Sequence, residues 1–184
     1  MNNKVVYVDN NATTMVAPEV TSAMLPFLKN FYGNPSSMHF FGGQVKKHLE
    51  HAREQVSALI NCDTTELVIT SCGSESDNMG IRCALEALDN DRNHLITSKV
   101  EHPAVKNTME YLAKKGYKVT EVAVDSRGML DMKHLKSCIS DKTALVSIMH
   151  ANNETGVIFP IEEIGEIVKE NGALFHIDAV QSVG

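Results

Sequence analysis

Residues 144–156 read ALVSIMHANNETG, a short apolar run that passes directly into a polar turn. Ala144–Met149 has the composition of a strand that is buried on both faces. His150–Gly156 then supplies imidazole, amide, carboxylate and hydroxyl groups in a stretch typical of a loop. This pattern is typical of a parallel α/β sheet, in which ligands bind beyond the carboxyl ends of the strands.

Segments of strand and helix composition alternate along the rest of the chain. Further strands are predicted over Lys4–Val8, Glu66–Thr70, His94–Ser98, Tyr117–Val122 and Ala173–Ile177. Helices are predicted over Gly43–Ile60, Ser74–Leu88, Pro103–Lys115, Met132–Ile139 and Pro160–Glu170, with Gly116 and Gly172 as C-caps. The alternation predicts an α/β fold with a mostly parallel sheet and helices on both of its faces.

Composition narrows the classes of function. The 184 residues are 43% hydrophobic and 22% charged, which is typical of a soluble globular protein. A net charge of −6 argues against a nucleic-acid partner. No apolar run suits a signal peptide or a membrane span, so we expect a cytoplasmic protein without a membrane partner. The four cysteines form no C-x-x-C pair, and no metal site is predicted.

The segment Cys72-Gly73-Ser74 stands where the second predicted strand passes into a helix. Free N–H groups and the positive end of the helix dipole favour an anion there, and Gly73 allows close approach to the backbone. A phosphate group suits such a place. An ordinary capped helix, with Ser74 as N-cap and Asp77 in its first turn, explains the same residues, so both interpretations stay open.

Asp178 follows the last predicted strand, whose interior is apolar. A poorly solvated carboxylate there requires a cationic partner, and a protonated pyridine nitrogen is one candidate. A structural ion pair or a helix cap is the alternative. The pair His176 and Asp178 also suggests a metal site, which we discount.

Three more side chains in these loops carry useful chemistry. His102 precedes Pro103, which favours an extended backbone, and its imidazole can stack on a flat ring or transfer a proton. Asn153 and Gln181 offer amides that can hydrogen-bond a phenolate or a carboxylate. The alternatives are a polar surface histidine and a plain turn over Asn152–Gly156.

Six motifs in order resemble the N-terminal portion of the NifS-type cysteine desulfurases, which are class V aminotransferases of pyridoxal-phosphate fold type I. The motifs are Val8–Thr14, Gly33–His39, Thr70–Asn78, Glu101–Val105, Asn152–Gly156 and His176–Gly184. The resemblance implies that the cofactor is pyridoxal 5'-phosphate and that Gly73 and Ser74 bind its phosphate. It also implies that His102 stacks on the pyridine ring and assists catalysis, and that Asp178 pairs with the pyridine nitrogen.

The resemblance further implies that Asn153 and Gln181 face the phenolic oxygen, with Asn153 also near the carboxylate of the substrate. The family reaction converts L-cysteine into L-alanine and an enzyme persulfide, whose sulfur passes to an iron–sulfur scaffold protein of the NifU or IscU type. Family members are homodimers. Two related expectations stay open: another fold type I enzyme such as a selenocysteine lyase, and a truncated, non-catalytic interaction module.

The family's Schiff-base lysine and persulfide cysteine have no counterpart in residues 1–184. We therefore expect the 184-residue chain alone to be inactive, with an incomplete sheet and exposed apolar helix faces. The resemblance also implies a division of the chain. Residues 1–14 are expected to associate with the small domain, and residues 15–184 to form the first part of the large cofactor-binding domain.

Overall fold

The computed structural model describes residues 5–88 and 91–183, which form two compact units. The N-terminal unit ends at Ile69, and the C-terminal unit spans Thr70–Val183. The division that we expect at residue 14 stays a prediction. Within the described residues, every helix is too short or too polar to traverse a bilayer.

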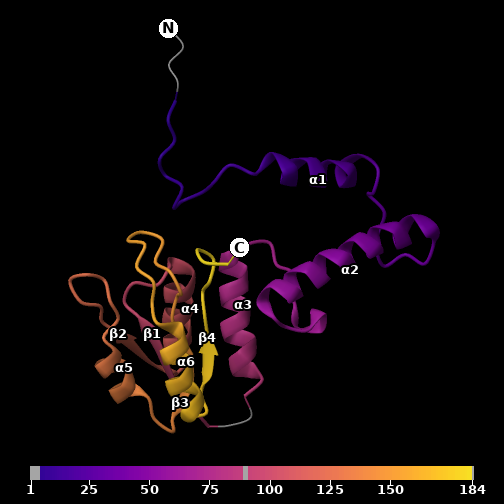
Figure 1. Ribbon diagram of the computed structural model, residues 1–184. Helices are drawn as coiled ribbons and strands as arrows, with labels where there is room; N and C mark the ends of the chain where they lie inside the picture. Colours follow the sequence, from indigo (N-terminus) through magenta and orange to yellow (C-terminus); the bar gives the residue numbers. More distant parts are fainter. Residues whose placement is uncertain (1–4, 89–90, 184) are drawn as a thin grey trace. The chain divides into compact units, whose positions relative to one another are not determined.

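The N-terminal unit consists of helices and extended segments (Figure 1). It contains α1 (Pro18–Lys29), α2 (Phe40–Ile60) and the 3₁₀ turn η1 (Thr64–Glu66). The sequence pattern does not predict α1, which begins with Pro18 and carries an acidic residue in its first turn and a basic residue in its last. Arg53 of α2 donates from Nη1 to the carbonyl oxygen of Leu67 at 2.8 Å.

Two of the predicted strands are wrong. Residues 5–8 form no strand, and Lys4 lies outside the described residues. Glu66 belongs to η1, where a capping box with Asp63 holds it, and residues 67–70 are extended but pair with no described strand. An apolar, β-branched run becomes a strand only when a neighbouring strand satisfies its backbone N–H and C=O groups.

The C-terminal unit contains a parallel four-stranded sheet in the order β2-β1-β3-β4. Its strands are β1 (His94–Ser98), β2 (Lys118–Val122), β3 (Thr143–Ser147) and β4 (Leu174–His176). These four strands confirm the corresponding predictions to within a few residues. Every residue of β1 and β3 is buried, as expected for the central strands of a covered sheet.

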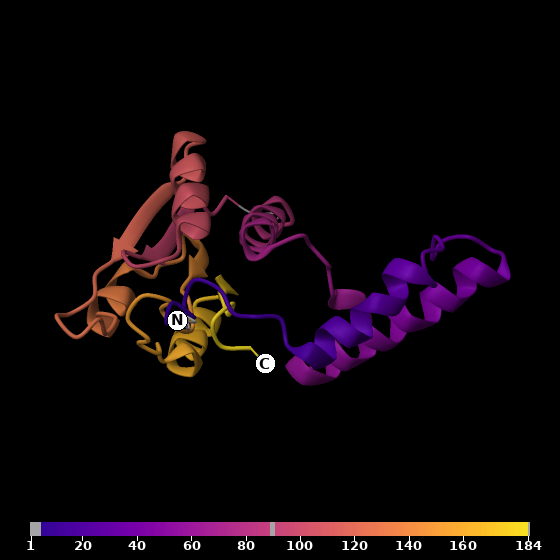
Figure 2. The ribbon, with the colours of Figure 1, turned by 90° about the horizontal axis from the view of Figure 1, so that it is seen from above.

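Helices cover both faces of the sheet, as predicted (Figure 2). They are α3 (Gly73–Glu86), α4 (Pro103–Lys114), α5 (Met132–Cys138) and α6 (Ile161–Glu170). Leu95 of β1 packs into a cluster with α3 and α4, whereas the next residue, Ile96, packs into a cluster with α5 and α6. Successive side chains of a strand point to opposite faces, so β1 contributes to both cores.

The amino ends of the strands are tied together by Arg92. Its Nη1 donates to the carbonyl oxygens of Thr143 at 3.1 Å, Asn171 at 3.3 Å and Gly172 at 2.6 Å. Gly116 (φ 103°) and Gly172 (φ 64°) follow the C-caps Lys115 of α4 and Asn171 of α6, so both glycines lie one residue beyond the predicted C-cap position. The loops with the candidate site residues follow the carboxyl ends of the strands, at the opposite edge of the sheet.

Candidate active site at the carboxyl ends of the strands

The segments that follow β1, β3 and β4 meet at one edge of the sheet (Figure 1). Backbone hydrogen bonds continue the parallel pairing past the strand ends, since Ile148 N donates to His176 O at 3.1 Å and His150 N donates to Asp178 O at 2.8 Å. The first turn of α3 lies at the same edge, because a Cβ built on Gly73 would stand 3.0 Å from Cγ2 of Val180. The four polar segments are therefore neighbours.

α3 begins differently from the capped-helix interpretation. Its N-cap is Cys72, not Ser74, and no side chain of that residue caps the helix. Instead Glu75 bonds back to Ser71, accepting from its backbone N at 2.7 Å and from its Oγ at 2.5 Å. Gly73 and Ser74 thus stand in the first turn, where backbone N–H groups and a hydroxyl are suited to an anion.

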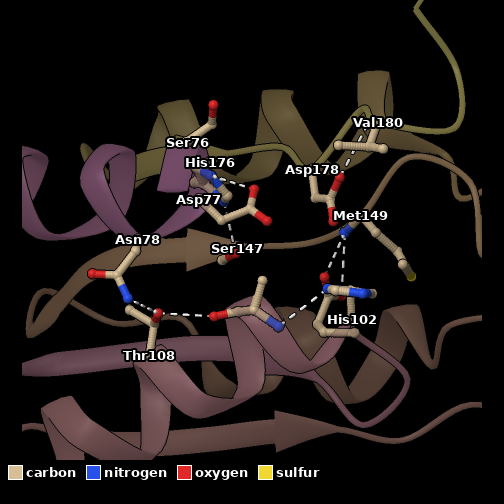
Figure 3. A network of polar contacts seen from close by, with 12 residues as sticks. Ser76, Asp77, Asn78, His102, Thr108, Ser147, Met149, His176, Asp178 and Val180 are labelled. Atoms are coloured by element: carbon tan, nitrogen blue, oxygen red, sulfur yellow. Dashed lines mark hydrogen bonds and ion pairs between the residues drawn. The ribbon is translucent and has the colours of Figure 1, made fainter. Parts of the chain in front are cut away.

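Asp178 lies just beyond β4 and is only 8% exposed. Its Oδ1 accepts a hydrogen bond from the backbone N of Val180 at 3.0 Å (Figure 3). Among the described residues, no lysine or arginine forms an ion pair with this carboxylate. A buried anion of this kind is suited to receive a cationic group from a ligand.

Two more buried carboxylates lie near Asp178. Burial raises the pKa of Asp77 to about 6; the negative charge of Asp178 raises it too, and His102 acts in the opposite direction. Burial likewise raises the pKa of Glu101 to about 7, against hydrogen bonds from Ser98 and Met149 that lower it, with Asp178 and Asp77 contributing repulsion. The edge therefore carries an excess of negative charge around Asp178.

His176 connects α3 to two strands (Figure 3). Its Nδ1 lies 2.9 Å from Oγ of Ser147 on β3, and its Nε2 lies 3.6 Å from Oδ1 of Asp77 on α3. Burial lowers the pKa of His176, although the charge of Asp178 opposes this shift. A neutral imidazole thus contacts Asp77. No group of three or more metal-ligating side chains occurs in the described part of the chain.

His102 is the N-cap of α4 and has the extended backbone that Pro103 predicts, with φ −59° and ψ 148°. Its Nδ1 accepts a hydrogen bond from Ala104 N at 3.1 Å, and its ring is exposed at the site. Asn153 is half-buried, and its Nδ2 donates to Oε1 of Glu154 at 3.0 Å. Gln181 is exposed in the turn after β4.

The structure thus brings Gly73, Asp178 and His102 to one edge, with Asn153 and Gln181 in the loops that follow β3 and β4. Sequence reasoning assigned no role to Glu101 or Asn152, although both belong to motifs quoted above. Both are deeply buried, at 4% and 6% exposure. The signal in the sequence is one polar residue in each of the two loops that follow the buried strands β1 and β3.

Comparison with known proteins agrees with this architecture. The model of the family described as aminotransferase class-V matches residues 6–184. A cysteine desulfurase of Nostoc sp. is 57% identical over 180 residues, which are 98% of this chain and 45% of the relative. The cysteine desulfurase NifS of Azotobacter vinelandii is 49% identical over 97% of this chain and 44% of its own length.

Solved structures extend the similarity to three dimensions. A NifS-like protein superposes with a TM-score of 0.92 at 43% identity, covering 96% of this chain and 49% of its own. A structure described as SspA in complex with cysteine superposes with a TM-score of 0.89 at 35% identity, covering 96% of this chain and 51% of its own. The chain spans about half the length of the relatives that it matches. From this family match, from the cysteine desulfurases that it resembles and from the parallel α/β fold, the chain belongs to the aminotransferase class-V family.

Proposed function

We propose that this chain is the N-terminal portion of a pyridoxal-phosphate-dependent cysteine desulfurase. The enzyme would convert L-cysteine into L-alanine and deliver the sulfur, as an enzyme persulfide, for iron–sulfur cluster assembly. The observation that carries the proposal is the buried carboxylate of Asp178, which has no lysine or arginine as an ion-pair partner among the described residues. The similarity to cysteine desulfurases along nearly the whole chain supports it.

The residues present fit this cofactor at both of its ends. The first turn of α3 offers backbone N–H groups and the hydroxyl of Ser74 to a phosphate, and a Cβ on Gly73 would crowd Cγ2 of Val180 at 3.0 Å. At the other end, Asp178 would hold a proton on a pyridine nitrogen, and Asp77 adds negative charge behind it. When bound, the cofactor supplies an electron sink for bonds broken at the α-carbon of an amino acid.

The remaining site residues have roles of orientation and proton transfer. His102 would lie against the ring and present its Nε2–H for proton transfer, because its Nδ1 accepts from Ala104 N and a neutral imidazole then carries its hydrogen on Nε2. Asn153 and Gln181 would donate to the phenolic oxygen, and Asn153 would also face the substrate carboxylate. The Schiff-base lysine and the persulfide cysteine have no counterpart in residues 1–184, so the proposal concerns the complete enzyme.

The wider setting follows from the same family. We propose a cytoplasmic homodimer that transfers sulfur to a scaffold protein of the NifU or IscU type. We also propose that residues 1–14 associate with a small domain, while residues 15–184 form the first part of the large domain. The chain's similarity to relatives named cysteine desulfurase supports a role in sulfur transfer.

The decisive experiment uses the complete gene product, purified and loaded with pyridoxal phosphate. Wild-type protein should release alanine from L-cysteine, and Asp178→Asn should reduce this rate by roughly 100-fold or more, because the charge opposite the pyridine nitrogen is lost. Comparing L-cysteine with L-selenocysteine separates a desulfurase from a selenocysteine lyase. An intact mass near 20.2 kDa for the endogenous protein, without alanine release, would contradict the proposal.

A further inference from the structure

The loop after β1 contains a buried glutamate that reaches across to the loop after β3. Both carboxylate oxygens of Glu101 accept from the backbone N of Met149, at 3.1 and 3.0 Å, and Oε1 also accepts from Oγ of Ser98 at 2.5 Å. Glu101 is 4% exposed and immediately precedes His102. The backbone that carries His102 is therefore tied to the end of β3.

The loop after β3 contains an asparagine that reaches in the opposite direction. Nδ2 of Asn152 donates to the carbonyl oxygen of Val100 at 3.0 Å. Its Oδ1 accepts from the backbone N of Glu154 at 3.0 Å and of Thr155 at 2.9 Å, which closes the turn around Asn153. Asn152 is 6% exposed. The backbone that carries Asn153 is thus tied to the loop after β1.

We propose that Glu101 and Asn152 are positioning residues that form a reciprocal clasp between the two loops and so fix His102 and Asn153 relative to each other. Each clasp residue directly precedes the residue that it positions. This inference rests on the proposed function, because it assumes that His102 and Asn153 contact the cofactor. It assigns the clasp to Glu101 and Asn152, both of which are deeply buried.

The chemistry of the clasp favours positioning over simple packing. A buried carboxylate near Asp77 and Asp178 works against stability, since like charges repel and burial disfavours the ionised form. An apolar side chain would fill the same space without this cost. Polar groups fix distance and direction, however, and two loops that must present side chains to one flat ring require both.

The test uses the complete gene product and the variants Glu101→Ala and Asn152→Ala. Each should weaken binding of pyridoxal phosphate by roughly 10-fold or more and shift the visible absorption band of the bound cofactor, because outer contacts of this kind orient the groups that touch a ligand. With cofactor in excess, kcat should fall more than KM rises. Glu101→Gln keeps an acceptor for Met149 N and should restore binding to within about three-fold of wild type.

Thr143→Val is the matched control. Thr143 is fully buried at the opposite end of β3, where its Oγ1 accepts from Ser140 N at 3.0 Å. The control should lower the melting temperature while leaving the cofactor affinity and the absorption band unchanged. If Glu101→Ala and Asn152→Ala behave like this control, or if Glu101→Gln is as impaired as Glu101→Ala, the clasp is refuted. Wild-type protein that binds no pyridoxal phosphate would instead refute the proposed function.

Discussion

The two units use similar amphipathic helices but bury very different amounts of them. α1 contains no buried residue, and α2 buries only Gly42 and Ser57. In the C-terminal unit, β1 and β3 are buried throughout, and α4 alone buries four residues. A helical pattern of apolar residues therefore specifies the helix, whereas a sheet or another helix with a complementary face determines whether that pattern becomes a core.

The same substitution in both units should give the largest contrast. Phe159 is 1% exposed in the core beside α6, whereas Phe40 at the start of α2 is 81% exposed. Phe159→Ala should lower the free energy of unfolding by about 3–5 kcal/mol because it leaves a cavity, and Phe40→Ala should change it by less than about 0.5 kcal/mol. Urea unfolding followed by circular dichroism measures both. Equal losses would show that the N-terminal unit has a packed core around Phe40.

Two arginines offer a second comparison. Arg92 donates to three carbonyl oxygens in two segments, those of Thr143 and of Asn171 and Gly172, while Arg53 donates to one. Arg92→Ala should cost about 2 kcal/mol of unfolding free energy, because three carbonyl groups lose a charged donor, and Arg53→Ala about 1 kcal/mol. Hydrogen exchange at the amides of β3 and β4 should accelerate in the first variant only. Unchanged exchange in Arg92→Ala would contradict the tie between the strand ends.

Two carboxylates, Glu101 in the C-terminal unit and Asp63 in the N-terminal unit, should respond oppositely to pH. Glu101 has an ordinary pKa of 4.5 and a folded pKa of about 7, so the folded protein binds more protons than the unfolded chain between these values. This contribution to stability is fully present below pH 4.5 and is lost as the pH rises through 7, by about 3 kcal/mol. Hydrogen bonds from Thr65 lower the pKa of Asp63, so its contribution is present above pH 3.8 and is lost at lower pH.

Urea midpoints of wild type and Glu101→Gln between pH 4.5 and 7 test this difference. The wild type should lose stability as the pH rises, and the variant should show a flatter profile because it has no proton to lose at this position. Parallel profiles for the two proteins would mean that Glu101 titrates at its ordinary value in the folded state.

The smallest expected effect concerns a closely packed place in the N-terminal unit, at Gly42. A Cβ on Gly42 would collide with the backbone oxygen of Asn34 and stand 2.8 Å from Cβ of Ser37, whereas a Cβ on Gly43 would meet nothing within 4 Å. Gly42→Ala should cost about 1 kcal/mol through overpacking, and Gly43→Ala should gain about 0.5–1 kcal/mol of helix stability. Thermal unfolding of the two variants gives the sign, and a gain in both would show that Asn34 moves freely.

Much of the fold could be predicted because its signals are local. The apolar period of α2 is plain, and the helix begins at Phe40 rather than Gly43 only because His39 caps it through Gly42 N. The wrong strand predictions concern segments whose structure depends on a pairing strand. Residues 5–8 and 66–70 have strand composition but pair with no described strand, and α1 escaped notice because Pro26 interrupts its pattern.

The predictable residues of the candidate site are those with suitable chemistry that follow directly after a strand. Asp178 after β4 and His102 after β1 fall at the expected edge for this reason. The clasp of Glu101 and Asn152 was not predictable, because it depends on the register between β1 and β3 and on how deeply the loops after these strands are buried. Those quantities arise only once the sheet has formed.

The strand order β2-β1-β3-β4 has a consequence for the making of the protein. During synthesis β1, the connecting helix α4 and β2 emerge first, and β1 can then pair with β2. The other edge of β1 presents unpaired N–H and C=O groups until β3 emerges. We expect ribosome-bound chains that end soon after Val122 to aggregate or recruit chaperones more readily than chains that extend beyond Ser147. Strand β1, which lies between β2 and β3 in the folded sheet, is thus an exposed edge strand in the nascent chain.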